Sequence, residues 1–102
     1  MLRAKIILVD LDGTLCEGEC WSPEECLYVK PLQKNIEKVN KLAKGNFIVI
    51  WTARRDHLIE ASIKWLRRNG VMFDAISNNK APADCYIDDK MFSFEDALKG
   101  GG

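Results

Sequence analysis

Two runs of apolar residues, close to the start and in the middle of the chain, contain no polar interruption. Continuous apolar residues, rather than apolar and polar residues in alternation, are typical of strands buried on both faces of a parallel sheet. We therefore predict strands over residues 5–10 and 47–51. Weaker apolar runs predict two further short strands over residues 71–76 and 84–87.

Between these strands the apolar positions follow a helical period. Residues 22–25 form a capping box with proline at the first helical position, which predicts one short helical turn. A longer helix is predicted from Pro31 to a stop at Gly45, and a second from about residue 56 to 69, with a last short helix over 93–99. The expected buried stripes of the two longer helices are Leu32, Ile36, Val39 and Leu42, and Leu58, Ile59, Ser62, Ile63 and Leu66.

Strands that alternate with amphipathic helices favour right-handed βαβ units and a parallel sheet covered on both faces. We therefore predict an α/β fold, a Rossmann-like three-layer α/β/α sandwich with a mainly parallel sheet of about four strands. A chain of 102 residues is expected to form a single domain over residues 1–102.

The composition narrows the class of protein. Apolar residues make up 47% of the chain, and its 15 basic and 15 acidic residues cancel, so no general attraction to nucleic acid or to anionic membranes is expected. The apolar runs are too short to span a bilayer, and the weakly basic first residues are not followed by a cleavage-site pattern. We expect a cytoplasmic protein that does not enter a membrane.

The four cysteines lack the paired Cys-x-x-Cys spacing of a zinc ribbon, and His57 is the single histidine. Reduced thiols are therefore the expected state. Two alternatives stay open at this point. Cys16, Cys20 and Cys26 could bind a metal, or Cys16 could form a disulfide with Cys20.

Polar side chains follow three of the predicted strands, at the point where each strand ends: Asp10 and Asp12, then Thr52, then Asp88 and Asp89. Parallel strands deliver such residues to one edge of the sheet, where α/β folds bind ligands. Two carboxylates about 4 Å apart repel by about 4 kcal/mol at an effective dielectric constant near 20, so a cluster of them requires a cation. Oxygen ligands alone indicate Mg²⁺.

A calcium-binding EF-hand loop also begins with Asp-x-Asp, but the sequence excludes it. Counting from Asp10, Leu15 stands where the loop requires glycine, and Trp21 stands where it requires the bidentate glutamate.

Four ordered motifs resemble those of the haloacid dehalogenase superfamily of phosphohydrolases. They are residues 10–15 (DLDGTL) after the first strand, residues 48–52 (IVIWT), Lys80, and residues 86–89 (YIDD). The resemblance extends over residues 5–89 and implies a small phosphatase without the cap domain that many members insert.

The resemblance implies a role for each matching residue. Asp10 would be the nucleophile that forms an aspartyl-phosphate, and Asp12 would be the general acid and base, which requires a pKa above the usual value of about 3.9. Thr52 would hold phosphate oxygens, and Lys80 would balance the charge of the phosphate and the nucleophile.

The backbone amides near Leu11 and Ala53 are also implied to bind phosphate, and Arg54 joins this set. Arg54, Arg55 and Lys90 are alternatives to Lys80 as the positive charge. The implied ligands of Mg²⁺ are Asp10, the carbonyl oxygen of Asp12, Asp88 and, more indirectly, Asp89.

The short connections leave room for only a small flap over residues 16–30, so the site should be open. An open site suits a small phosphorylated sugar or similar metabolite, or a bulkier substrate such as a polynucleotide 3′-phosphate end or a phosphoprotein. Nucleic acid is thus expected only as a substrate. Trp21 and Tyr28 in the flap could stack on a base or sugar, or could simply pack.

Few residues follow Asp89, which predicts an open sheet edge and oligomerisation, or else a fold close to the minimum size.

Each motif also has a purely structural interpretation. An Asp-Gly pair is a common turn, Thr52 could cap the following helix, and the Asp88-Asp89 pair could start one. The main alternative to an enzyme is a module that binds phosphate or Mg²⁺ without turnover. Phosphotransfer or carbon–halogen cleavage on the same scaffold is a third hypothesis.

Overall fold

The computed structural model describes residues 3–79 and 83–87, which contain a four-stranded parallel sheet. The elements in chain order are β1 (Ile6–Asp10), α1 (Pro23–Tyr28), α2 (Gln33–Ala43), β2 (Phe47–Trp51), a 3₁₀ turn (Asp56–Leu58), α3 (Ile59–Arg68), β3 (Ala75–Ser77) and β4 (Cys85–Ile87). The predicted Rossmann-like α/β fold is confirmed.

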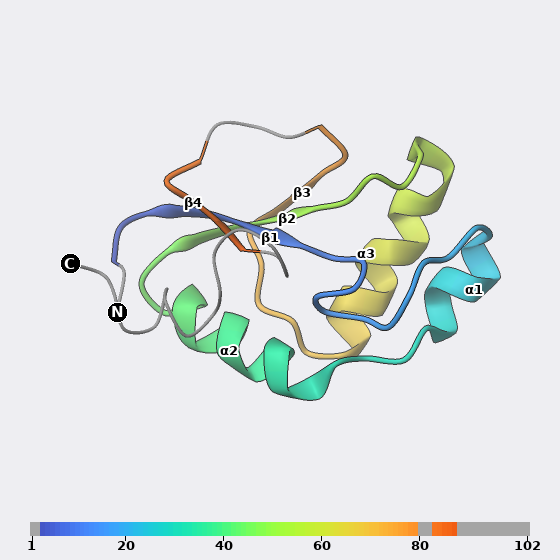
Figure 1. Cartoon of the computed structure of the whole chain (residues 1–102), viewed down its shortest axis with the longest axis horizontal. Helices are drawn as coiled ribbons and strands as arrows, with labels where there is room; N and C mark the ends of the chain where they lie inside the picture. The colour runs from blue at the N-terminus through green and yellow to red at the C-terminus, as the bar shows by residue number, and fades with distance from the viewer. Residues whose placement is uncertain (1–2, 80–82, 88–102) are drawn as a thin grey trace.

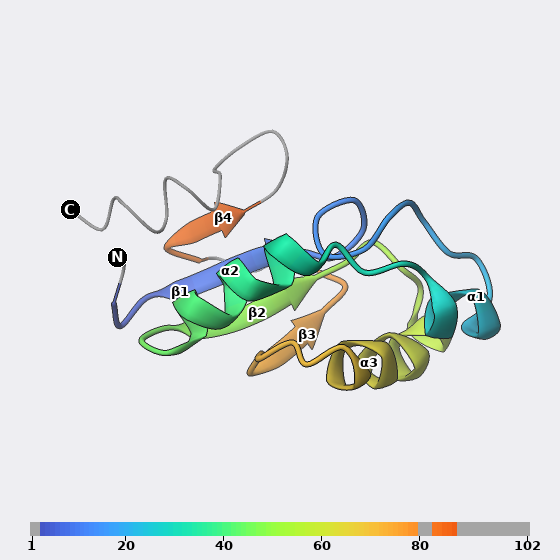
Figure 2. The ribbon, with the colours of Figure 1, turned by 90° about the horizontal axis from the view of Figure 1, so that it is seen from below.

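The strand order β3-β2-β1-β4 places β1 between β2 and β4. Asp10 at the end of β1 pairs with Trp51 at the end of β2, and Trp51 pairs with Ser77 at the end of β3. On the other side of β1, Val9 pairs with Ile87, the last residue of β4. All four strands therefore finish at the same edge of the sheet, toward α1 and α3 in Figures 1 and 2.

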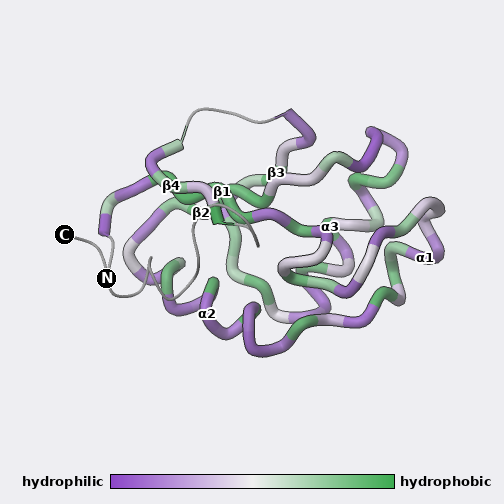
Figure 3. Tube along the Cα trace, in the orientation of Figure 1, coloured by the Kyte–Doolittle hydropathy of each residue, from purple (hydrophilic) through white to green (hydrophobic). Residues whose placement is uncertain are grey.

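One face of the sheet carries the main core. Every second residue of β1 and β2 points to it and is fully buried: Ile7, Val9, Ile48 and Ile50. The apolar face of α2 packs against these residues through Ile36, Val39 and Leu42, as the helical spacing predicted. Figure 3 shows the resulting contrast between the apolar strands and the hydrophilic outer side of α2.

Burial on the opposite face of the sheet is less complete than the continuous apolar runs predicted. Ile6 and Phe47, which begin β1 and β2, are exposed, and Val49 is half-buried. The third layer of the predicted sandwich stays a prediction, because the helix predicted over residues 93–99 lies outside the described residues.

The helices α1 and α3 lie side by side at the edge where the strands end (Figure 1). The predicted capping box begins α1: the Ser22 hydroxyl accepts a hydrogen bond from the Glu25 amide at 3.2 Å, and Pro23 is the first helical residue. Gly70 follows α3 with a φ of +72°, the left-handed conformation that ends many helices. These two predicted helix boundaries are confirmed.

Two predicted starts, those of α2 and β3, are wrong by a few residues. The helix expected from Pro31 begins at Gln33, because Pro31 and Leu32 pair with the loop after β1: Pro31 bridges to Cys16, and the Leu32 amide donates to the Leu15 carbonyl at 2.9 Å. The helix expected from residue 56 opens with a 3₁₀ turn.

The strand expected over residues 71–76 is reduced to Ala75–Ser77. The residues before it bond elsewhere: the Val71 amide donates to the last turn of α3, and the Met72 amide donates to the Asn40 side chain of α2. The predicted helical stripe of α3 is also rotated, because Ala61 and Trp65 are buried while Ile59 and Ile63 are only half-buried. None of the helices in the described part of the chain has the length and apolar character that crossing a bilayer requires.

Candidate active site at the carboxyl edge of the sheet

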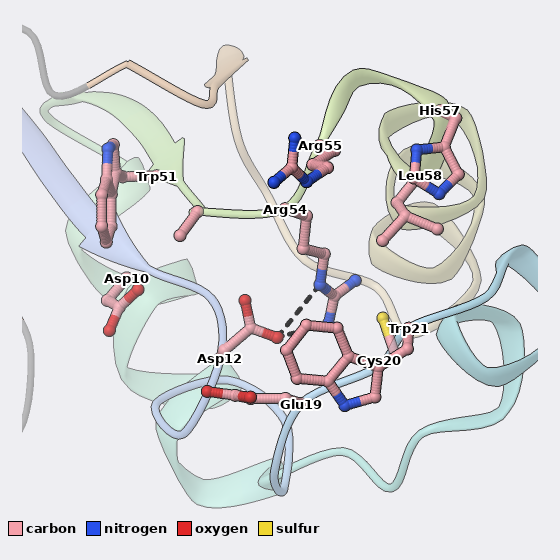
Figure 4. Close-up of a pocket in the computed structure, with 11 residues that line it drawn as sticks. Asp10, Asp12, Glu19, Cys20, Trp21, Trp51, Arg54, Arg55, His57 and Leu58 are labelled. Atoms are coloured by element: carbon pink, nitrogen blue, oxygen red, sulfur yellow. Dashed lines mark hydrogen bonds and ion pairs between the residues drawn. The ribbon is translucent and has the colours of Figure 1, made fainter.

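A cavity of about 440 Å³ opens at the carboxyl edge of β1 and β2. Figure 4 shows the residues that surround it. Two of them, Asp10 and Asp12, come from the end of β1 and the turn after it. The other lining residues are Glu19, Cys20, Trp21, Trp51, Ala53, Arg54, Arg55, His57 and Leu58.

The turn after β1 determines where Asp12 lies. Leu11 is still bonded to the sheet, because its amide donates to the Trp51 carbonyl at 2.9 Å, and its own carbonyl accepts from the Leu15 amide at 2.9 Å. Gly13 then reverses the chain with a φ of +81°, a conformation that residues with a Cβ rarely adopt. The glycine thus turns the chain directly after Asp12, whose carboxylate lies beside residues that follow β2.

Three hydrogen bonds hold the carboxylate of Asp12. The Thr52 hydroxyl donates to Oδ2 at 2.9 Å, while Nε and Nη2 of Arg54 donate to Oδ1 at 3.0 and 2.7 Å. The guanidinium is almost completely buried, with its side chain 4% exposed against 20% for Asp12. Arg54 thus fixes Oδ1 and Thr52 fixes Oδ2, and the two contacts together set the orientation of the carboxylate.

Arg54 is held in turn from behind. Its Nη1 donates to the Ser62 hydroxyl at 2.8 Å, and that hydroxyl donates to the Leu58 carbonyl at 2.7 Å. Ser62 was expected only as part of an apolar stripe on α3. A serine among buried apolar residues needs a hydrogen-bond partner, and that signal in the sequence points to a buried polar network.

Thr52 and Arg54 therefore both donate to Asp12; Arg54 also lines the cavity, whereas Thr52 is not among the lining residues. The Thr52 hydroxyl is completely buried and also accepts a hydrogen bond from the Arg54 amide at 3.1 Å. To bind phosphate as the resemblance implies, Thr52 would have to release Asp12. The Arg54 guanidinium likewise donates to Asp12 and Ser62, whereas the neighbouring Arg55 is exposed and also lines the cavity.

Cys16 completes the buried surroundings of Arg54. Its sulfur lies 3.5 Å from Nη2 of Arg54 and 3.6 Å from the Leu11 carbonyl oxygen. Burial raises the pKa of the Cys16 thiol from 9.0 to about 11, against the opposing effect of the Arg54 charge. Cys16 is therefore a neutral thiol at neutral pH and serves as a packing residue.

The backbone amides around the cavity differ in whether they already have a hydrogen-bond partner. The Leu11 amide, one of the predicted phosphate ligands, already donates to Trp51. The amides of Asp12 and Ala53 have no hydrogen-bond partner within residues 3–79 and 83–87. These two amides, from the ends of neighbouring strands, are therefore the better candidates for binding an anion.

The predicted metal ligands fall partly inside the described region. Asp10 and Asp12 line the cavity, whereas Asp88, Asp89 and Lys80 lie outside the described residues. Within the described residues, no group of three or more His, Cys, Asp and Glu side chains could hold a metal ion.

The chemistry of the donors at the end of β1 fits the predicted mode of magnesium binding. The side chain of Asp12 is occupied by Thr52 and Arg54, while its carbonyl oxygen accepts no hydrogen bond from the described part of the chain. Asp10, the last residue of β1, and the Asp12 carbonyl in the turn after it are both hard oxygen donors of the kind that Mg²⁺ prefers.

The cysteines of the flap are not all reduced, and they do not pair as proposed from the sequence. Cys20 forms a disulfide with Cys26 of α1, while Cys16 and Cys85 are free and buried. The proposed Cys16–Cys20 disulfide is therefore wrong. A metal site formed by Cys16, Cys20 and Cys26 is also wrong, because the sulfurs of Cys20 and Cys26 are bonded to each other.

Several cavity residues were not predicted from the sequence: Glu19, Trp51 and His57. Trp51 was expected only as the last apolar residue of a strand, and His57 was considered only as a metal ligand. Both stand within six residues of the end of β2, and this proximity to a strand end was the signal that could have identified them.

Comparison with known proteins identifies two similar structures. No protein-family model and no curated protein matches the chain. A chain of the Pnkp1/Rnl/Hen1 complex has a TM-score of 0.62 and 18% sequence identity over 96% of this chain. A chain of the Pnkp1/Rnl/Hen1 RNA repair complex has a TM-score of 0.60 and 16% identity over 85% of this chain. This chain spans only 35% and 27% of their lengths, and at such identities the likeness shows the α/β fold alone.

Proposed function

We propose that the chain is a Mg²⁺-dependent phosphomonoester hydrolase of the haloacid dehalogenase type, with Asp10 as the nucleophile. The observation that carries this proposal is the pair of carboxylates in one cavity, of which Asp12 is held in a fixed orientation by Thr52 and Arg54. A carboxylate held in this way has lost its freedom to rotate, which is useful for a group that must exchange a proton with a substrate.

The reaction would proceed in two steps. In the first, a carboxylate oxygen of Asp10 attacks phosphorus, the bond between phosphorus and the leaving oxygen breaks, and Asp12 transfers a proton to that oxygen. In the second, water attacks the phosphorus of the aspartyl-phosphate and gives a proton to Asp12. The bond to Asp10 breaks, and inorganic phosphate leaves with both carboxyl groups restored.

The hydrogen bonds of Asp12 favour one of its two oxygens as the carrier of the proton. Oδ1 accepts two hydrogen bonds from the cationic Arg54, whereas Oδ2 accepts one from the neutral Thr52 hydroxyl. A proton on Oδ1 would lie against positively charged donors, so Oδ2 is the oxygen suited to proton transfer. Arg54 and Thr52 are then positioning residues for Asp12.

Phosphate and metal would bind at the ends of the strands. The amides of Asp12 and Ala53 would bind phosphate oxygens, with Lys80 or Arg55 as the balancing positive charge. Mg²⁺ would be held by Asp10, the carbonyl oxygen of Asp12 and Asp88, with Asp89 nearby. The ion would supply charge neutralisation for the phosphate group.

The structure supports the reaction type more directly than it supports a particular substrate. The small cavity suits a phosphorylated sugar or similar metabolite, which was the first expectation from the sequence. The alternative, a polynucleotide end, is supported by the fold it shares with chains of an RNA repair complex. Homo-oligomerisation stays part of the proposal, because the exposed residues at the start of β1 and β2 leave apolar surface uncovered.

The decisive experiment measures phosphate release from an aryl phosphate by the purified chain and by Asp10→Asn. We expect release that requires Mg²⁺ and stops with a chelator, and a decrease in kcat of about 10⁴-fold or more in the variant. Denaturation during turnover should trap an acid-stable, alkali-labile phosphoryl group on the wild-type chain and none on Asp10→Asn.

A matched control is Glu37→Gln, which removes an exposed carboxylate from α2 and should leave turnover unchanged. Full activity of a folded Asp10→Asn variant would refute the proposal. Binding of Mg²⁺ and phosphate with no turnover on a wide panel of monoesters would instead support a non-catalytic module.

A further inference from the structure

Trp21 is an exposed aromatic residue that borders the cavity. Its side chain is among the most exposed large apolar groups of the described chain, 74% exposed, yet it lines the same space as Asp10 and Asp12. Figure 4 shows its ring, from the flap after β1, on the opposite side of Asp12 from Trp51. A tryptophan that leaves most of its surface in water contributes little to the core, so its position needs another explanation.

The backbone on both sides of Trp21 is firmly held. Cys20, directly before it, is buried and forms the disulfide with Cys26. This pair packs against Leu58 and Ala61, next to the cavity. Ser22, directly after it, caps α1. An exposed ring on a rigid backbone loses little conformational freedom when a ligand stacks on it, which makes it a pre-organised contact.

The other cavity residues indicate the chemistry of the ligand. Arg55 supplies positive charge and His57 a ring hydrogen-bonding group on the side of the cavity formed after β2. Glu19 supplies an acceptor beside Trp21. A matching ligand would have a flat ring for the indole face of Trp21 and an amino group for Glu19. It would also carry a phosphorylated sugar, whose oxygens would accept from Arg55 and His57. A nucleobase has that combination, and a simple sugar phosphate lacks the flat ring.

We propose that Trp21 is a stacking platform for a nucleobase of the substrate, so that the site acts on a nucleoside phosphate or on the phosphorylated end of an oligonucleotide. The inference rests on the proposed phosphatase function and specifies its substrate class. The phosphate would lie at the ends of β1 and β2, and the base would lie against the flap.

The test compares four substrates: a nucleoside 3′-monophosphate, a short oligonucleotide with a 3′-phosphate, ribose 5-phosphate and glycerol phosphate. In Trp21→Ala we expect KM for the two base-containing substrates to rise about 5- to 150-fold, the range that base–aromatic stacking spans, with little change in kcat. KM for glycerol phosphate should not change. Trp21→Phe keeps an aromatic face and should recover most of the loss.

Tyr28→Ala is the matched control. Tyr28 is as exposed as Trp21, 77%, and lies in the same flap, but it is not a cavity residue and stands beside Arg68 instead. Its removal should leave every KM unchanged. Of the two base-containing substrates, the one with the higher kcat/KM identifies the natural source of the nucleobase.

The proposal is overturned if Trp21→Ala changes all four KM values equally or none of them, or if ribose 5-phosphate is hydrolysed as efficiently as the base-containing substrates. Failure of the phosphatase function itself would be recognised separately. Titration of the nucleoside 3′-monophosphate into the chain should quench tryptophan fluorescence whether or not phosphate is released, and the quenching should be smaller in Trp21→Phe, in which Trp51 is the remaining tryptophan of the cavity lining. Absence of quenching in the wild-type chain would also refute the proposal.

Discussion

The two walls of the cavity are held in place by different means. On the inner wall, the cavity residues Asp12 and Arg54 are held by side-chain hydrogen bonds to each other and to Thr52 and Ser62, which lie behind them. The outer wall, residues 19–21 of the flap, is held by the Cys20–Cys26 disulfide and by the cap of α1, and it presents the exposed ring of Trp21 to solvent.

The two walls therefore fix their side chains with different precision. A group that transfers a proton must be oriented to a fraction of an ångström, and directional hydrogen bonds supply that orientation. A group that stacks on a ring needs a fixed backbone but tolerates some movement of the side chain. The two walls should therefore respond differently to substitution, and three further experiments test this.

The largest effect is expected when the inner wall loses its cation. Arg54→Ala leaves the Asp12 carboxylate, 20% exposed, without its two strongest donors. We expect the free energy of unfolding to fall by about 3 kcal/mol, since removing one partner of a buried ion pair is costly. The loss of orientation at Asp12 should lower kcat about 100-fold on every substrate, with little change in KM. Denaturant titration and steady-state kinetics measure the two effects.

Arg67→Ala, at an exposed position of α3, is the control for a lost arginine and should change stability by less than about 0.5 kcal/mol. Arg54→Lys restores the charge without the two-point contact, so it should recover stability more than kcat. If Arg54→Ala kept the wild-type kcat, Arg54 would be a structural residue only, and the contrast between the walls would disappear.

The second experiment removes the covalent link of the outer wall. The double variant Cys20→Ala/Cys26→Ala opens a short loop, and the chain-entropy treatment of disulfides predicts a loss of about 2 kcal/mol in the free energy of unfolding. KM for base-containing substrates should rise because Trp21 is no longer held. The kcat for glycerol phosphate should stay at the wild-type value, because no residue of the inner wall is altered.

A reducing agent should reproduce the kinetic effect in the wild-type chain and have no effect on the double variant. If the double variant or the reduced wild-type chain had a lower kcat for glycerol phosphate, the two walls would be coupled.

The smallest effect concerns Cys16, which lies behind the inner wall. Because burial raises the pKa of its thiol from 9.0 to about 11, the unfolded chain releases this proton at lower pH than the folded chain. The contribution of Cys16 to stability is complete below pH 9 and is lost as the pH rises toward 11. Between pH 8 and pH 10, the wild-type chain should lose about 1 kcal/mol more than Cys16→Val.

The comparison uses the pH dependence of each chain, so a constant difference in stability between them does not affect it. Burial also raises the pKa of Cys85, but that residue is present in both chains and cancels. Parallel pH profiles would show that the Cys16 proton is not linked to folding.

The sequence predicted most of the fold, because strand and helix patterns are local. Continuous apolar runs located β1 and β2 to within a residue, and helical spacing identified the buried face of α2. The errors lie where a distant residue competes for the backbone. The loop before α2 pairs with Cys16, and the chain before β3 bonds to Asn40, and neither partner can be read from a local pattern.

For the candidate site, the positions were predicted and most contacts were not. The sequence alone determined that Asp10, Asp12 and Thr52 stand at strand ends, because hydrophobic periodicity shows where each buried strand stops. Only the tertiary structure decided that Arg54 contacts Asp12 across 42 residues, that Cys20 pairs with Cys26, and that Trp21 borders the cavity. The physical reason is that a strand is determined by its own residues, whereas an ion pair, a disulfide or a cavity wall depends on which distant side chains meet when the chain packs.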